Sequence, residues 1–261
     1  MSDQSLLLIT HHSLLITHHL PLGVPGMLDR EKLFEALDNF RHKLFRLAAA
    51  LVILAAIGYW QAPFIAAFLQ RPNPVPLVFY APAEAFLTNM KLGVFAAIFL
   101  LMPVIFYLIW DSFAFYVTPY SRRYAAPVVA AASLLFLVGG YLCYALVLPI
   151  GFNFLLGFGG EIADPQLSVD RYFSFVLIMS FAFGTFFELP LGMLLLGKAG
   201  LVNSRLLSRY RRYAILAIVI IAAIITPTTD AYTLALMAGP LMILYEVSIV
   251  LVRLFGKAEG G

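Results

Sequence analysis

The feature that most constrains this chain is an apolar stretch of bilayer length, residues 174–195, that contains one carboxylate. The stretch reads SFVLIMSFAFGTFFELPLGMLL, and Glu188 stands two positions before Pro190. About 20 apolar residues in a helix cross the hydrocarbon core of a membrane. A charged side chain at that depth costs roughly 3 kcal/mol to insert and is retained where it faces a water-filled cavity, a partner or a neighbouring helix. Glu188 is therefore the first candidate functional residue, a membrane-cavity glutamate.

The alternative interpretation of Glu188 is a protonated carboxyl group, or one close enough to the interface to reach water. Pro190 and Gly192 permit a bent helix, and a bend lets water approach both the backbone and the side chain.

The amino-acid composition of the whole chain is that of a polytopic membrane protein. Hydrophobic residues make up 62% of the 261 residues and charged residues 12%, against roughly 25% charged residues in a soluble domain. The one cysteine, Cys143, excludes an intrachain disulfide and a cysteine-based metal cluster. All five histidines precede the first predicted span. A rhomboid-like serine protease or a membrane metalloprotease would need a histidine within the membrane, so we do not expect an enzyme.

Residues 1–26 contain a near-perfect tandem repeat, SLLLITHH followed by SLLITHH. The repeat has no helical period, and we expect a non-native or disordered extension, with the protein proper beginning at Met27. A histidine-rich metal-binding tail is the alternative. A cleaved signal peptide fits less well, because the basic residues follow the apolar run.

Six membrane spans are predicted after an amphipathic helix over residues 28–46, in which apolar residues recur at spacings of three and four. This helix is expected to lie on the cytoplasmic membrane surface and to run into the first span. The spans are predicted at residues 47–59, 92–110, 128–148, 174–195, 213–225 and 231–254. We therefore predict an all-α protein with one membrane domain over residues 27–256 and a short cytoplasmic tail at 257–261.

Proline and glycine residues divide the predicted spans. Residues 61–89 contain too many prolines for a buried helix, although 65–69 could form a short surface helix. Pro103 is expected to kink the second span and Pro149 to end the third, before a polar, glycine-rich connection at 151–171. The fifth span, about 13 residues long, reaches only about 20 Å. Against about 30 Å of hydrocarbon, either the bilayer thins there or the helix ends inside the membrane.

Charge predicts the orientation of the spans. Six spans place both termini, and all basic residues except Arg71, Lys91 and Arg171, on one side of the membrane. By the positive-inside rule that side is cytoplasmic, so the acidic segment 161–170 faces outward. The tight connection TPTTD at 226–230 forces the last two spans into an antiparallel hairpin.

Four segments, in this order, resemble the TatC family, the receptor subunit of the twin-arginine protein translocase. They are FGTFFELPL at 183–191, RRYAIL at 211–216, TPTTD at 226–230 and GPLMILYE at 239–246. The similarity extends over residues 33–254. It implies six transmembrane helices that form a concave, cupped wall in the bacterial cytoplasmic (inner) membrane. It also implies that Glu188 lies on the concave face, where it draws water and thins the bilayer.

The resemblance implies a core subunit that binds the twin-arginine signal peptides of folded cargo proteins and nucleates the export complex. The expected partners are TatA/TatB-like single-span membrane subunits, the signal peptides, the lipid bilayer and further copies of the chain in a homo-oligomer. Neither a cofactor, a metal nor a nucleic acid is expected. Transport in the family is driven by the proton-motive force.

The chain departs from the family at the two positions expected to bind the paired arginines of a signal peptide. There the family has glutamates, whose carboxylates pair bidentately with arginine forks. Alignment on Arg41 places Asn39 at the first position, and alignment on Arg122 and Arg123 places Ser121 at the second.

Three nearby acids remain to bind the signal peptide in their place. Glu35 and Asp38 share the N-terminal helix, and Asp111 follows the second span. The plain alternative for Glu35 and Asp38 is a solvated helix face. If recognition has been lost, the chain is a diverged paralogue that acts as a scaffold. A proton-coupled transporter of small solutes is a weaker alternative, because the halves show no internal repeat.

The resemblance also implies that polar residues near the tip of the last hairpin contact the small subunits. Thr226 and Thr233 match polar positions, Asp230 closes the turn, and Leu234 stands where the family commonly has glutamine. One hydrogen bond between membrane helices contributes only about 0.6 kcal/mol, so its loss weakens such a contact without abolishing it. An ordinary turn is the alternative for 226–230. A structural pair is further expected between Glu246 and Arg253.

Overall fold

The computed structural model describes residues 27–71, 76–117, 121–159, 166–226 and 231–256, without the side chains of 27–40, 112–117, 121–124, 155–156 and 158–159. The predicted N-terminal extension and C-terminal tail lie outside these residues. The chain divides into two compact units, Met1–Ala48 and Ala49–Gly261. Each unit is described by itself.

Helix α2, Met27–Trp60, begins in the first unit and is assigned as a single helix. This confirms that residues 28–46 and 47–59 are helical. The structure marks no break between the expected surface helix and the first span. A position of 28–46 on the membrane surface stays a prediction.

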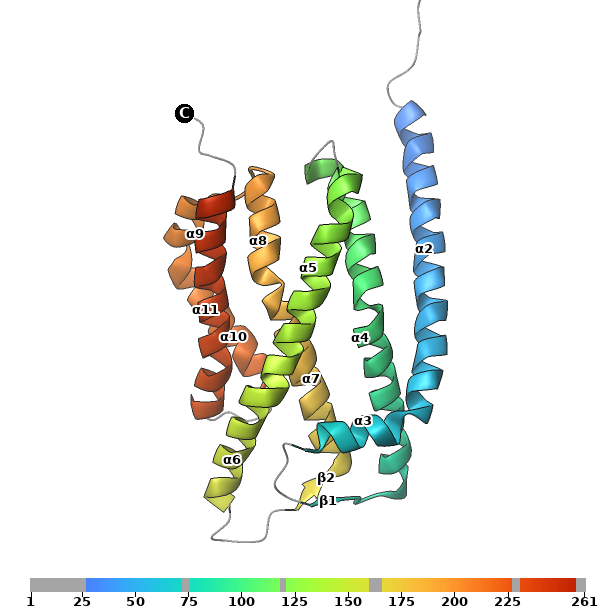
Figure 1. Cartoon of the computed structure of the whole chain (residues 1–261), viewed down its shortest axis with the longest axis vertical. Coiled ribbons are helices and arrows are strands. Elements are labelled where there is room, and N and C mark those ends of the chain that lie inside the picture. The colour runs from blue at the N-terminus through green and yellow to red at the C-terminus, as the bar shows by residue number, and fades with distance from the viewer. Residues whose placement is uncertain (1–26, 72–75, 118–120, 160–165, 227–230, 257–261) are drawn as a thin grey trace, which may run out of the picture. The chain divides into compact units, whose positions relative to one another are not determined.

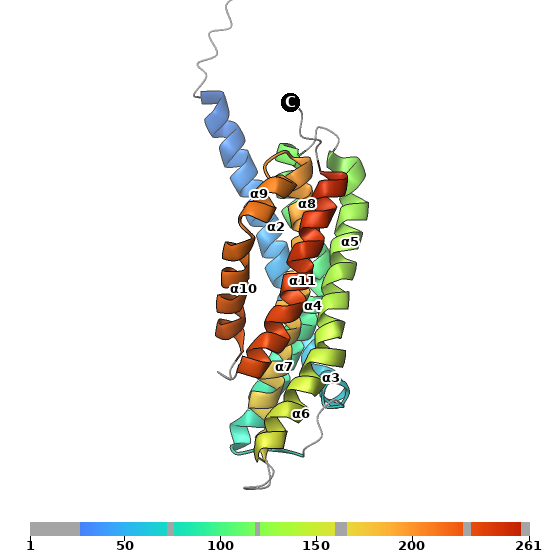
Figure 2. The same ribbon diagram turned by 90° about the vertical axis from the view of Figure 1, so that its left-hand side faces the viewer.

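The second unit is helical almost throughout, which confirms the all-α class (Figures 1 and 2). Two very short strands form a parallel pair in which Leu77 aligns with Leu167. The elements are α3 (Ala62–Leu69), β1 (Leu77–Val78), α4 (Pro82–Val117), α5 (Ser121–Leu142), the π-helical turn η1 (Cys143–Val147), α6 (Leu148–Gly159), β2 (Leu167–Ser168), α7 (Val169–Phe187), α8 (Leu189–Lys198), α9 (Ser204–Arg209), α10 (Arg211–Ile225) and α11 (Ala231–Phe255).

Five stretches of the described chain are long and apolar enough to cross a membrane. They are Arg41–Trp60, Pro82–Asp111, Ala125–Phe154, Val169–Lys198 and Ala231–Phe255, and they match the predicted spans one to four and six. The predicted fifth span is helix α10, whose 15 residues reach about 22 Å. Its shortness is confirmed, whereas the count of six membrane crossings stays a prediction.

The prediction that Pro149 ends the third span is wrong. The N–H of Leu148 donates to the carbonyl of Cys143, five residues back, so the helix widens into a π turn just before the proline. Pro149 has no N–H to donate, and a wider turn gives its ring the room that an α-helix would deny it. Helix α6 therefore continues to Gly159, and the first half of the expected polar connection is helical.

Polar side chains join the N-terminal ends of α4 and α7. The Nζ of Lys91 lies 2.6 Å from Oδ1 of Asp170 and donates to Oγ of Ser174 at 2.9 Å. Oε1 of Glu84 accepts a hydrogen bond from Oγ of Ser168 at 2.7 Å. Neither Lys91 nor Glu84 was assigned a role from sequence, because their partners lie some 80 positions along the chain.

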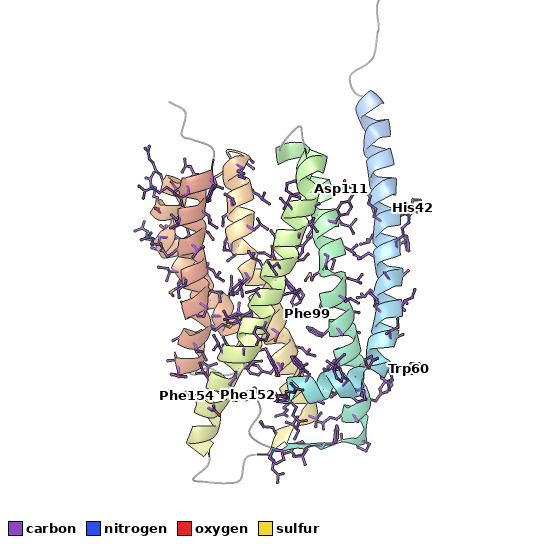
Figure 3. The ribbon with its side chains drawn as sticks, viewed as in Figure 1. His42, Trp60, Phe99, Asp111, Phe152 and Phe154 are labelled. Atoms are coloured by element: carbon purple, nitrogen blue, oxygen red, sulfur yellow. The ribbon has the colours of Figure 1, made fainter. Side chains whose placement is uncertain are left out.

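Helices α5 and α7 pack closely together because each places a phenylalanine against a glycine of the other. A Cβ at Gly139 would lie 2.7 Å from the ring of Phe187, and one at Gly184 would lie 2.7 Å from the ring of Phe136. Small residues of this kind let membrane helices approach closely. Phe136 also contacts Phe99 of α4, with ring centroids 5.0 Å apart. Phe99 is labelled in Figure 3.

We expect Gly139→Ala to lower the free energy of unfolding by about 1–3 kcal/mol, because the added methyl group has no room. The new Cβ would also lie 2.8 Å from the backbone oxygen of Phe183, which cannot move as a side chain can. Thermal unfolding in detergent measures the change. Gly192→Ala in α8 is the matched control, since nothing lies within 4 Å of its added Cβ. Equal behaviour of the two variants would contradict the proposed close packing.

Candidate functional site

A break between two helices positions Glu188. Helix α7 ends at Phe187 and α8 begins at Leu189, where the ribbon is interrupted (Figure 1). Pro190 has no N–H and therefore leaves the carbonyl of Phe186 without its usual helical donor. The N–H of Glu188 turns to the carbonyl of Thr185, three residues back, at 3.2 Å. The helix is therefore interrupted at the glutamate, next to the proline that permits a bend.

The carboxyl group of Glu188 is half-buried in this break. Its Oε1 is buried and accepts no hydrogen bond from the described part of the chain. The preceding residue, Phe187, packs against Gly139, so the contact between α5 and α7 holds the backbone next to the glutamate. A rigid backbone thus presents an incompletely satisfied carboxyl group within a membrane-spanning segment, a position at which acids are usually functional.

The last hairpin, formed by α10 and α11, holds the predicted partner-contact residues. The hydroxyl of Thr226 is buried and donates to the carbonyl of Ala222 in its own helix at 2.9 Å. Thr233 is buried on α11, and Leu234 is partly buried against the apolar core. Asp230 lies outside the described residues. A contact between these residues and other subunits stays a prediction.

The expected pair of Glu246 with Arg253 is wrong, because Glu246 pairs with Arg211 of α10. Nε of Arg211 lies 2.9 Å from Oε1 of Glu246, and its Nη2 donates to Oε2 at 2.9 Å, a bidentate arrangement. Arg253 lies seven residues beyond Glu246, about 10 Å further along α11. Both partners stand in segments quoted for the family resemblance, but only the packing of α10 on α11 brings them together.

The N-terminal candidates for signal-peptide binding lie on helix α2. Glu35, Asp38 and Asn39 are within its helical span, but their side chains are not among those described. Arg41 is exposed on the same helix. The structure therefore confirms the helix that carries these residues and leaves their role a prediction.

The remaining candidates lie in the second unit. Asp111 is exposed in the C-terminal part of α4, at the end of the membrane-spanning segment (Figure 3). Ser121, Arg122 and Arg123 form the first turn of α5, and their side chains are not described. A binding site that combines them with the α2 candidates stays a prediction.

The fold and the helix break define a polytopic α-helical membrane protein with a carboxyl group inside one span. A family model described as "Sec-independent protein translocase protein (TatC)" matches residues 35–240, and the chain belongs to this family. It is accordingly a subunit of a protein translocase, a transport protein that works with other components.

Relatives and solved structures agree with this assignment. The TatC protein of Carboxydothermus hydrogenoformans is 34% identical over 230 residues, covering 87% of this chain and 95% of its own. That of Aquifex aeolicus is 35% identical over 229 residues, covering 85% and 95%. A crystal structure of the twin arginine translocase receptor TatC superposes with a TM-score of 0.75 at 35% identity, covering 84% of this chain and 98% of that one.

Reversing one charge of the Arg211–Glu246 pair is expected to destabilise the hairpin. Arg211→Glu places two carboxylates together and should lower the free energy of unfolding by about 1 kcal/mol, the range of half-exposed ion pairs. The double reversal Arg211→Glu with Glu246→Arg should regain most of the loss. Thermal unfolding in detergent at low and high salt measures both.

Arg212→Glu is the matched control for this pair. Arg212 is exposed, contacts only its neighbour Tyr213 among the described residues, and changes charge by the same amount. A loss in Arg212→Glu as large as that in Arg211→Glu, or no recovery in the double reversal, would show that the bidentate pair does not stabilise the hairpin.

Proposed function

We propose that this chain is the translocase subunit that binds the twin-arginine signal peptides of folded cargo and nucleates the export complex in the bacterial cytoplasmic membrane. The observation that carries the export role is the buried Oε1 of Glu188, which accepts no hydrogen bond within the described chain. Such a group is tolerated at membrane depth when water or a partner reaches it. We propose that both water and the single-span subunits that join the complex reach this oxygen.

The length of α10 supports the same proposal. At about 22 Å it is shorter than the roughly 30 Å of hydrocarbon in an average bilayer. A bilayer that thins beside α10 brings water closer to the level of the broken helix. Thinning next to a glutamate lowers the barrier that a polar cargo meets.

Recognition of the signal peptide is assigned to Glu35, Asp38 and Asp111. Glu35 and Asp38 are three residues apart within helix α2, about one helical turn. Two carboxylates at this spacing suit two adjacent guanidinium groups, and bonds between charged partners are about twice as strong as neutral ones. The basic side of the chain, with both termini, is assigned to the cytoplasm, where signal peptides are presented.

A scaffold without signal recognition is the second candidate function. It is favoured by Asn39 and Ser121, which stand where the family has carboxylates. It would leave the export complex assembling around the chain while a different protein supplies signal recognition.

We expect a photoreactive twin-arginine signal peptide to crosslink to the purified protein in a manner that depends on its arginines. Replacing both peptide arginines by lysine removes the planar guanidinium groups that bind carboxylates bidentately. Crosslinking should fall about tenfold, which corresponds to a loss of about 1.4 kcal/mol in binding free energy. Glu35→Ala with Asp38→Ala should reduce it similarly. The yield of the crosslinked product, resolved by mass spectrometry, is the measurement.

Glu161→Ala with Asp164→Ala is the matched control for crosslinking, because it removes two acids from the segment that the charge pattern predicts to face outward. It should leave the yield unchanged. Arginine-dependent crosslinking that survives loss of Glu35 and Asp38 would move the site to Asp111. A parent protein with no arginine-dependent crosslink would contradict the receptor role and favour the scaffold.

Removing the carboxyl group of Glu188 should separate stability from function. Glu188→Leu is expected to raise the free energy of unfolding by about 1–3 kcal/mol, because an unsatisfied buried polar group is lost. The same variant should abolish export of a twin-arginine reporter, and Glu188→Gln should reduce it. Thermal unfolding in detergent and export in cells lacking their own TatC are the two readouts.

Thr185→Val is the control for Glu188, since Thr185 is exposed one turn earlier and, among the described residues, its hydroxyl bonds only to the carbonyl of Phe181 in its own helix. Export should persist in this variant. Full export by Glu188→Leu would show that the carboxyl group has no part in transport.

A further inference from the structure

We propose that helix α3 lies in the membrane interface and inserts its exposed apolar face into the upper part of the acyl chains. The face consists of Phe64, Ala67 and Phe68, and its partner is the leaflet in which the stretch Arg41–Trp60 ends. This lipid-binding surface is separate from Glu188. It does not depend on the proposed receptor role.

Helix α3 is apolar on all sides. Its eight residues, APFIAAFL, include no polar side chain. The side that packs against α4, α7 and the apolar core is formed by Ala62, Ile65, Ala66 and Leu69. On the other side Phe64 is 75% exposed and Phe68 is 42% exposed. A helix that is apolar all round is stable where both of its sides are out of water. Protein covers one side of α3, so the other side requires an apolar medium.

The N-terminal end of α3 is held at the end of a membrane-spanning stretch. That stretch ends at Trp60, and only Gln61 separates it from Ala62. The carbonyl of Gln61 accepts hydrogen bonds from the N–H groups of Phe64 and Ile65, so α3 begins directly after the turn. Two steps along the backbone reach at most about 7 Å. The first turn of α3 therefore lies within about 7 Å of the end of the span.

The C-terminal end of α3 is attached to two other membrane-spanning stretches. The hydroxyl of Tyr144 donates to the carbonyl of Phe68 at 2.6 Å, and that of Tyr172 donates to the carbonyl of Leu69 at 2.8 Å. These tyrosines belong to the stretches Ala125–Phe154 and Val169–Lys198. The last carbonyls of a helix lack partners within it, and near lipid they must be satisfied by protein. Figure 1 shows α3 running across the other helices, with the strand pair and the end of α6 beyond it.

The residues at the two ends of α3 are typical of a membrane interface. Trp60 is 88% exposed, and tryptophan is enriched at the level of the lipid headgroups. Arg71 follows the helix, and its guanidinium carbon lies 5.5 Å from the centre of the Phe68 ring. An arginine in this position can keep its stem on apolar surface while its charge reaches a phosphate.

Lipid is preferred to a protein partner because the exposed face of α3 continues that of α2. Ile53 and Ile57 precede Trp60 by about two turns and one turn, and they are 60% and 55% exposed. These side chains belong to a stretch that is long and apolar enough to cross a membrane. The apolar surface therefore extends without a polar residue from Ile53 to Trp60 along this side of α2 and resumes at Phe64.

The test is the depth of a tryptophan placed on α3 of the full-length protein in phosphatidylcholine vesicles. The chain has two tryptophans, so Trp60→Phe with Trp110→Phe gives a parent to which Phe64→Trp adds a single emitter. Phospholipids brominated near the headgroup should quench this emission at least about twofold more than phospholipids brominated near the chain end, because an interfacial helix enters only the upper acyl region. Iodide in the water should quench it weakly.

Gln166→Trp in the same parent is the matched control. Gln166 is exposed next to β2, at the same end of the bundle but outside α3. Iodide should quench this variant at least about threefold more than Phe64→Trp, and brominated lipid should quench it less. A phospholipid with a photoreactive group high on its acyl chain should crosslink to residues 60–68 of the unaltered protein, which tests the same surface without any substitution.

Four outcomes would overturn the proposal. Equal quenching of Phe64→Trp and Gln166→Trp by iodide would place α3 in water. Shielding of Phe64→Trp from both iodide and brominated lipid would show that a protein, such as a second copy of the chain, covers the face. Stronger quenching by bromine at the chain end would place α3 deep in the bilayer. Absence of a lipid crosslink at residues 60–68 would exclude contact with the acyl chains.

Discussion

The close contact between α5 and α7 is the constraint on which the rest of the second unit depends. Phe187 occupies the space left by Gly139, and Phe136 occupies the space left by Gly184, so neither helix can shift without a clash. The buried Phe183 and the ring contact of Phe136 with Phe99 extend the contact to α4. Because bilayer lipid is as apolar as these side chains, the contact is stabilised by close packing and not by exclusion of water.

Two prolines in this part of the chain have opposite effects. At Pro149 a π turn precedes the ring, and the helix continues into α6. At Pro190 there is no such turn, and α7 ends beside Glu188. A backbone group that loses its partner inside a membrane must be satisfied by protein or by water. The break at Glu188 therefore places a carboxyl group and a disturbed backbone at the same point, which suits a site that admits water or a partner.

Ion pairs join helices at both ends of the unit. Lys91 and Asp170 connect α4 to α7 at one end, and Arg211 and Glu246 connect α10 to α11 at the other. The second pair also forms part of the wall of a recess between α9 and α11.

The sequence by itself determined the class of protein, five of the spans and the shortness of α10, and it singled out Glu188 as a candidate. Each of these follows from local quantities, namely the length of an apolar run and the cost of a charge within it. The continuation of the helix past Pro149 required the π turn, and the partner of Glu246 required the packing of α10 on α11. The glycine contacts and the partner of Lys91 were decided only by the tertiary structure. They join residues far apart in the chain, and hydropathy and spacing carry no information on which faces of two helices meet.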